Sequence, residues 1–209
     1  YQYPLFQKKN QHIINAAKKF IKKELGLEIK SDPRILINDQ LVMDAQSKYK
    51  IDSKKINILL GIGGSGPTKR IPAKIFIDFM RLTTQKYKCK FFLATGKDID
   101  EQKILLEILS SDYKDNCYAL DNLSLKEILP IIKSCNISIC NDSSFSHLSS
   151  GLGIQTIILM SDTPLLYGSY SPRMHPIMPD GENTVTHNTL GKLKINPNKI
   201  FEKLNNILD

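Results

Sequence analysis

Short apolar runs alternate with amphipathic stretches of helical length from residue 56 onward, and few folds accommodate that alternation. The runs that are apolar enough to form buried strands are 56–61, 89–94, 136–140 and 155–160. The stretches with a helical pattern are 73–87, 99–110, 125–134, 146–152 and 197–208. Fully apolar strands separated by helices are typical of a parallel sheet that is covered on both faces. The sequence therefore predicts an α/β fold, a Rossmann-like parallel sheet with helices on both faces.

The first 55 residues follow a different pattern. In KKNQHIINAAKKFIKKELG, apolar residues and lysines fall on opposite faces of a helix, which Gly26 would end. The lysine face would suit an anionic membrane, although a solvated face is the usual explanation of such a pattern. Residues 31–55 are polar and rich in turn formers, which predicts a linker, or a strand followed by a crossing loop. We therefore divide the chain into 1–55, an amphipathic helix and linker, and 56–209, one domain.

Charge and cysteine usage limit the classes of partner. The chain carries a net charge of +8, which permits nucleic acid, an anionic membrane or an acidic small molecule. It has neither an aromatic-rich basic strand pair nor a helix-turn-helix pattern, so nucleic acid is not expected. No apolar run approaches the length of a membrane span. The four cysteines lack CxxC spacing and the four histidines lack metal-site spacing. We expect reduced cysteines, an intracellular location and no metal.

The loop GIGGSGPTKRIP, residues 61–72, follows the first predicted strand and resembles several phosphate-binding loops. Its glycines fit GxGxxG, but Pro67 and Pro72 delay the helix and CKFFLATG ends the next strand without an acidic residue, which argues against a dinucleotide site. Pro67 also stands where a Walker lysine would be. Glycine amides with nearby hydroxyls and a cation still suit a phosphate, unless the glycines only turn the chain. The predicted contacts are Gly63, Gly64, Ser65, Thr68 and Lys69.

A second constellation, SICNDSSFSHLSSGLG at 138–153, repeats this arrangement. A strand ends near Cys140, and the polar residues after it open a helix whose free N–H groups would favour an anion. Asp142 would add a carboxylate and His147 an imidazole that could bond or neutralise a phosphate oxygen, although an N-cap and an ordinary helical histidine would look the same. DSSFS is not the GxSxG elbow of a serine hydrolase. Both loops would lie at the carboxyl edge of one sheet and form one pocket.

Together, GIGGSGPTKRIP and NDSSFSHLSSGLGIQTIILMSDTP resemble the C-terminal half of the family 9 glycosyltransferases, the ADP-heptose:lipopolysaccharide heptosyltransferases. The resemblance is closest over residues 56–165. It implies the GT-B architecture, in which two Rossmann-like domains face a cleft and the C-terminal one binds the nucleotide sugar. Residues 1–55 would then come from the end of the N-terminal domain, and the general base would lie in that domain.

The resemblance also implies roles for individual residues. Donor phosphates would contact Ser65, Thr68 and Lys69, and the diphosphate and sugar would be engaged by Asp142, Ser143, Ser144 and His147. The turn at 162–164 would place Thr163 beside the nucleotide. Two positions depart from the family, because Ser144 replaces a glycine and Ile71 a tryptophan.

The implied activity is inverting transfer of heptose, or a related sugar, from a nucleoside diphosphate to the lipopolysaccharide core, with ADP-heptose as donor and no cofactor. The implied location is cytoplasmic, at the cytoplasmic face of the inner membrane. Three alternatives stay open: a GT-B enzyme that uses a UDP- or GDP-sugar, a non-catalytic nucleotide- or nucleic-acid-binding module, and a dinucleotide oxidoreductase.

Overall fold

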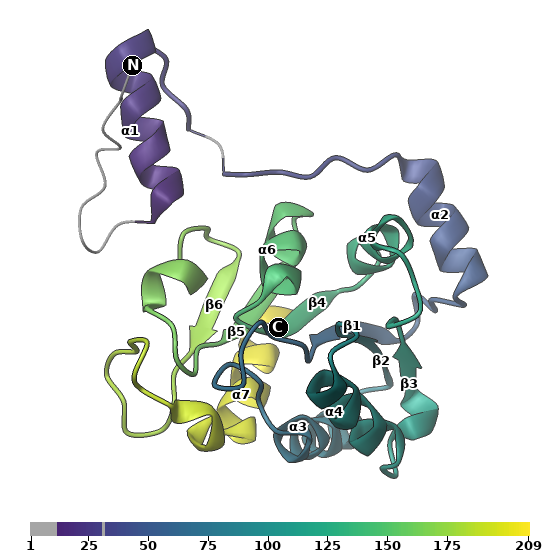
Figure 1. Ribbon diagram of the computed structural model, residues 1–209. Coiled ribbons are helices and arrows are strands. Elements are labelled where there is room, and N and C mark those ends of the chain that lie inside the picture. Colours follow the sequence, from purple (N-terminus) through teal and green to yellow (C-terminus); the bar gives the residue numbers. More distant parts are fainter. Residues whose placement is uncertain (1–11, 31) are drawn as a thin grey trace.

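Six parallel strands form one sheet in the computed structural model, which describes residues 12–30 and 32–209 (Figure 1). Along the sheet the strands follow the order β3-β2-β1-β4-β5-β6. Their bounds are β1 Ile56–Gly61, β2 Cys89–Ala94, β3 Cys117–Ala119, β4 Ile137–Asn141, β5 Gln155–Leu159 and β6 Met174–Ile177. The order reverses between β1 and β4, which is the point where open parallel sheets bind their ligands. The predicted α/β parallel sheet is confirmed.

The described part of the chain also forms seven α-helices and three short 3-10 helices. The α-helices are α1 Ile13–Leu25, α2 Asp39–Lys48, α3 Ala73–Lys86, α4 Ile99–Leu109, α5 Leu125–Lys133, α6 Ser144–Gly151 and α7 Pro197–Leu208. The 3-10 helices are η1 Lys114–Asn116, η2 Leu165–Gly168 and η3 Gly191–Lys194. No helix in the described part of the chain is long and apolar enough to cross a membrane.

The two faces of the sheet bury different side chains, as the alternation of residues along a strand requires. Ile58 and Leu60 of β1 pack with helices α3, α4 and α7, whereas Leu59 between them packs with α2, α5 and α6. Figure 1 shows α3, α4 and α7 below the sheet and α2, α5 and α6 above it. Helices therefore cover both faces, as predicted.

Several helix ends follow the local signals in the sequence. Gly26 ends α1 in the left-handed region, with φ of 67°, and its N–H donates to the carbonyl of Lys22. Ser124 and Glu127 form the expected capping box of α5. The Asn196 side chain caps α7 by accepting the N–H of Asn198, and Pro197 occupies the first helical position.

The sequence analysis did not predict helix α2. Its prediction of only a linker, or a strand and a loop, over residues 31–55 was wrong. The sequence of α2, DQLVMDAQSK, is polar, but Asn38 caps the helix and Ala45 packs into the core. Lys48 also pairs with Glu127 of α5 at 3.3 Å. Tertiary packing therefore decides the structure of this segment. The short edge strands β3 and β6 were missed as well, and β6 contains a proline that only an edge strand tolerates.

Candidate functional site: two loops at the carboxyl edge of the sheet

The two predicted loops meet at the carboxyl edge because β1 and β4 are neighbours. Gly61 at the end of β1 lies opposite Cys140 in the parallel register. The side-chain amide of Asn141 then donates to the carbonyls of Ile62, at 2.8 Å, and Gly63, at 3.2 Å. These two hydrogen bonds therefore join residues that are 79 and 78 positions apart in the sequence. The ends of the two strands form one rim.

An ion pair between Lys69 and Asp142 also joins the two loops. The ammonium of Lys69 lies 2.9 Å from Asp142 Oδ2, and the Asp142 side chain is only 4% exposed. A buried carboxylate needs such a partner to remain charged. The structure therefore brings together the cation and the carboxylate that the sequence places in separate motifs. Lys69 keeps a partly exposed side chain and can donate to a second anion.

Glu101, which the sequence analysis did not identify, forms a hydrogen bond with the glycine loop. It lies in the first turn of α4, is 7% exposed, and accepts the N–H of Gly64 at 2.6 Å. A Cβ atom on Gly63 would lie 2.9 Å from Glu101 Oε1, and one on Gly96 would lie closer still to Oε2. Two glycines therefore make room for this carboxylate.

This position corrects the expectation that no acidic residue follows the second strand. Helix α4 begins after the cap at Asp98, and its first turn folds back beside the strand end. The acid therefore comes from the helix and not from CKFFLATG itself. The sequence marks the start of this helix, because acidic residues are enriched in a first helical turn, but it does not show that Glu101 reaches the glycine loop.

A cavity of about 390 Å³ opens between the glycine loop, Glu101 and the start of α6. Its lining comprises Gly63, Gly64, Ser65, Gly96, Glu101, Ser143, Ser144 and Phe145. No side chain caps the N-terminus of α6, so its first backbone N–H groups are available there. Three buried side-chain oxygens around this rim have no hydrogen-bond partner: Thr95 Oγ1, Asn141 Oδ1 and Ser143 Oγ. Buried polar atoms are normally bonded, so these three indicate a ligand or water site.

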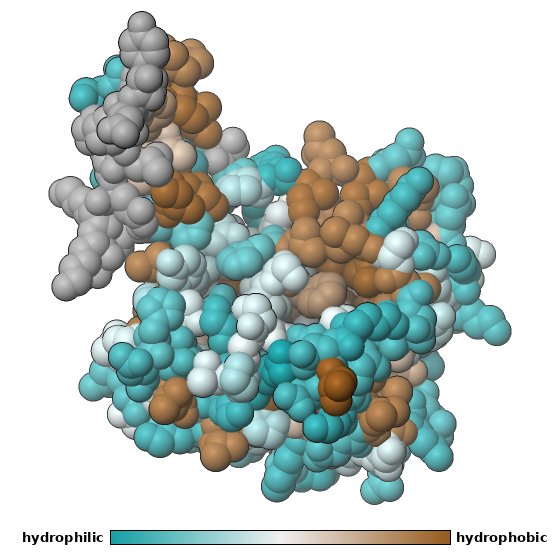
Figure 2. Space-filling view, in the orientation of Figure 1, coloured by the Kyte–Doolittle hydropathy of each residue, from teal (hydrophilic) through white to brown (hydrophobic). Residues whose placement is uncertain are grey.

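A second cavity of about 500 Å³ adjoins the first along α6, since both are lined by Ser144 and Phe145. His147 and Tyr170 also line it, and most of its other walls are apolar. Figure 2 shows apolar side chains gathered over α5 and α6 on the side that faces α1. Ser144 therefore stands at the boundary between the two cavities.

His147 is partly buried, and this burial lowers the pKa of its imidazole, although the nearby Asp142 raises it. Its Nδ1 lies 2.8 Å from the hydroxyl of Tyr170. The lowered pKa favours the neutral imidazole in the chain as described, and such a ring can hydrogen-bond a phosphate oxygen.

Thr68 and Thr163 lie outside the lining of both cavities. The carbonyl of Thr68 accepts the hydroxyl of Ser161 at 2.9 Å, so the glycine loop is attached to the end of β5. Thr163 is buried, and its hydroxyl has no partner. Ile71 is fully buried and packs in the core.

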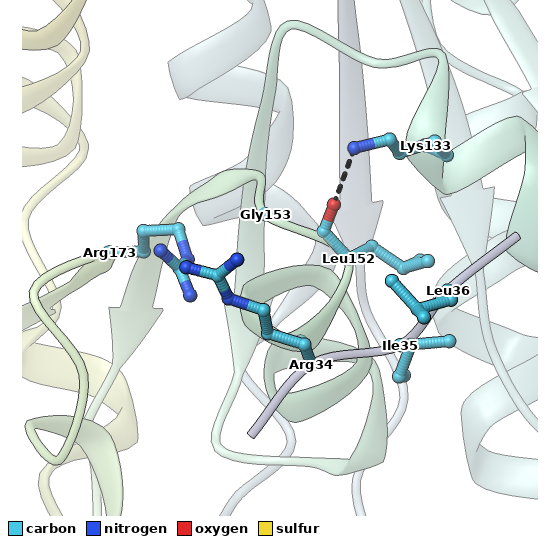
Figure 3. Close-up of a pocket in the computed structure, with 8 residues that line it drawn as sticks. Arg34, Ile35, Leu36, Lys133, Leu152, Gly153 and Arg173 are labelled. Carbon is cyan, nitrogen blue, oxygen red and sulfur yellow. Dashed lines mark hydrogen bonds between the residues drawn. The ribbon is translucent and has the colours of Figure 1, made fainter. Parts of the chain in front are cut away.

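A third cavity, of about 320 Å³, lies at the opposite end of α6 and is not the predicted site. Figure 3 shows the guanidinium groups of Arg34 and Arg173 pointing toward one another, with Lys133 on the other side. Lys133 donates to the carbonyl of Leu152 at 2.8 Å, and Arg173 donates to that of Ser150 at 3.1 Å. These two cations therefore stabilise the carboxyl end of α6, where the helix dipole is negative.

Lowering the pH should destabilise the folded chain, because burial lowers the pKa of His12, His147 and His175. Their ordinary value is 6.5, so below pH 6.5 the unfolded chain binds more protons than the folded one. We expect the melting temperature to fall between pH 7.5 and 5.5, a range above the titration of the carboxylates. His147→Gln should make this fall smaller; an unchanged pH dependence would contradict the described burial of His147.

The comparisons with known proteins agree with this geometry. A family model described as glycosyltransferase family 9 (heptosyltransferase) matches residues 1–194. Lipopolysaccharide heptosyltransferase 1 of Campylobacter coli is 25% identical over 159 residues, which are 75% of this chain and 46% of the relative. The chain thus spans about half the length of this curated relative.

Solved structures with the same fold include two similar proteins. The glycosyl transferase family 9 structure from Veillonella parvula superposes with a TM-score of 0.74 and 18% identity, covering 99% of this chain and 62% of that one. E. coli heptosyltransferase WaaC with ADP superposes with a TM-score of 0.70 and 14% identity, covering 96% and 58%. These likenesses show that the sheet and its helices have the arrangement of a GT-B Rossmann-like domain.

Proposed function

Because the chain belongs to glycosyltransferase family 9, we propose that it binds the nucleotide-sugar donor of a heptosyltransferase. The proposed reaction transfers heptose, or a related sugar, from ADP-heptose to the lipopolysaccharide core. In this proposal residues 56–209 form the donor-binding domain, and residues 1–55 connect it to the domain that binds the acceptor. The observation that carries the proposal is the 390 Å³ cavity, where the open N-terminus of α6 and unpartnered hydroxyls converge beside the glycine loop.

The diphosphate of the donor fits best between the glycine loop and the start of α6. The N–H groups at Ser144 and Phe145 would bind phosphate oxygens, assisted by the positive end of the helix dipole. Lys69 would add a charged donor while Asp142 holds its ammonium at the rim. These groups would stabilise the charge that develops on the diphosphate as it leaves.

Glu101 is the group best suited to the ribose of the donor. One of its oxygens accepts from Gly64, and the carboxylate still lines the cavity. Carboxylates at this edge of Rossmann-like sheets bind ribose hydroxyls. We therefore propose that the nucleoside lies on the β2 side of the diphosphate and that the sugar lies on the side of Lys69 and His147.

In the proposed chemistry, an acceptor hydroxyl attacks the anomeric carbon of the donor. The bond from that carbon to the diphosphate oxygen breaks, and the configuration inverts. The bonding electrons leave with the diphosphate, and the hydroxyl proton passes to a base. None of the described residues is assigned the role of that base.

Nucleotide binding tests the proposed function directly. At 100 times the dissociation constant, ADP should stabilise the chain by about 2.7 kcal/mol, which raises the melting temperature by several degrees. UDP, GDP and NADH at the same concentration serve as matched controls. A rise in melting temperature with UDP or GDP alone would indicate that the donor is a UDP- or GDP-sugar and not an ADP-sugar. A rise with NADH alone would favour an oxidoreductase. No shift with any nucleotide at millimolar concentration would contradict the proposal.

We also propose that α1 contacts the anionic cytoplasmic face of the inner membrane, where a lipopolysaccharide acceptor would lie. Exposed Leu25, Leu27 and Ile29 follow the lysine-rich face of this helix. We expect the chain to co-sediment with phosphatidylglycerol vesicles at low salt and to dissociate at 0.5 M salt, about the range where such attraction is screened. Equal binding to phosphatidylcholine vesicles would argue against this role of charge.

A further inference from the structure

Tyr170 lies between two histidines that come from different helices. Its hydroxyl is 2.8 Å from Nδ1 of His147, one turn into α6. Its ring stacks on that of His147 with centroids 5.6 Å apart, and on that of His12, the N-cap of α1, with centroids 4.3 Å apart. The three rings therefore link the start of α1 to the helix that opens the donor site.

Burial favours neutral histidine rings in this stack. It is the largest effect on the pKa of His147 and lowers it, whereas Asp142 raises this pKa and Lys69 lowers it further. Burial, with Asp32 and Asp142, raises the pKa of Tyr170, so the phenol keeps its proton. Asp32 itself accepts from the hydroxyl of Ser171 and pairs with a lysine of α1, Lys18, at 3.5 Å.

A neutral histidine has two tautomers, and the partner of one nitrogen selects which is present. The phenol is a much stronger acid than a neutral imidazole N–H, so the better donor in this pair is the Tyr170 hydroxyl. Nδ1 then accepts, and the ring proton sits on Nε2. Without this bond, the imidazole would exchange between a form that donates from Nε2 and a form that accepts there.

We propose that Tyr170 is a positioning residue, which holds His147 in the Nε2–H tautomer so that a neutral imidazole presents a hydrogen-bond donor to the anionic ligand at the head of α6. The inference rests on the proposed nucleotide-sugar function for the identity of that ligand. The stack on His12 makes the same tyrosine a contact between α1 and the site. The tautomer of His147 can be observed without any ligand.

Tyr170→Phe keeps both ring stacks and removes only the hydroxyl. Nitrogen-15 NMR of the histidine rings should show the Nε2–H form of His147 in the wild type and a mixture of tautomers in the variant. ADP affinity should fall about threefold to tenfold, the range for one neutral hydrogen bond. Tyr167→Phe is the matched control, because Tyr167 contacts His12 edge-on at 5.8 Å and no hydrogen bond of its hydroxyl is described.

A second variant separates positioning from packing. His147→Gln places an amide N–H near the position of Nε2 whatever the state of Tyr170, so it should keep most of the ADP affinity. Tyr170→Phe should then cause no further loss in that background. An unchanged tautomer and unchanged affinity in Tyr170→Phe would overturn the inference. If the wild type binds no nucleotide, the proposed function fails, and the NMR result alone decides whether Tyr170 sets the tautomer.

Discussion

Replacing Lys69 by alanine should weaken ADP binding by about tenfold to 100-fold, the range for a charged hydrogen bond to phosphate. Lys69 of the glycine loop lies 2.9 Å from Asp142 of the second loop. Isothermal titration of ADP into the wild type and the variant measures the effect. Lys54→Ala is a suitable control, since it removes an exposed lysine before β1. Equal affinities for the wild type and Lys69→Ala would remove the phosphate role of this lysine.

The same substitution should also lower the stability of the fold. It leaves the carboxylate of Asp142 buried without its partner, and breaking such pairs costs about 3–5 kcal/mol when both groups are fully buried. The loss here should be smaller, because the Lys69 side chain is 25% exposed. The double variant Lys69→Ala/Asp142→Asn should regain most of the stability and none of the ADP affinity. Recovery of both properties would show that Lys69 acts only by neutralising Asp142.

Gly61→Ala should lower the free energy of unfolding by about 2–3 kcal/mol, the upper range for overpacking a dense core. A Cβ at this position would lie 2.6 Å from Cys140 Sγ and 3.2 Å from the Cβ of Phe145. These neighbours belong to β4 and α6, so the substitution would push the site's helix away from β1. Urea denaturation followed by circular dichroism measures the loss.

Gly66→Ala supplies the matched control for Gly61→Ala. A Cβ on Gly66 would meet no atom within 4 Å, and its φ is not positive. Its stability should therefore stay within about 0.5 kcal/mol of the wild type, as for most surface changes. If both glycine variants unfold at the same urea concentration, the close contact between β1 and α6 is not as described.

The central strands were predictable from sequence because burial on both faces makes them continuously apolar. The four predicted strands correspond to β1, β2, β4 and β5, the four neighbours at the middle of the sheet. The edge strands were not predictable in this way, because β3 has only three residues and β6 contains a proline. Helix α2 shows the same limit, since its polar sequence becomes helical through its cap and its packing on α5.

The loops of the candidate site were predictable as motifs, but their mutual contacts were not. Glycines and polar residues after strands indicate an edge site, which the paired loops occupy. The pairing of Lys69 with Asp142 joins residues 73 positions apart, and the bond from His147 to Tyr170 joins two different segments. Glu101 reaches the glycine loop from another helix. Contacts of this kind depend on the folded topology, and no local pattern encodes them.

The cavity needs both β1 and β4, which are neighbours in the sheet but far apart in the sequence, so it forms late in the synthesis of the chain. The intervening segment contains β2, β3, three α-helices and the 3-10 helix η1, and it must leave the ribosome before Asn141 can reach the carbonyls of Ile62 and Gly63. Closing so long a loop has an entropic cost that only the completed sheet repays. A nascent chain that ends before β4 therefore has the glycine loop without the cavity. If the proposed function holds, a nucleotide would stabilise the chain only after its central strands have paired.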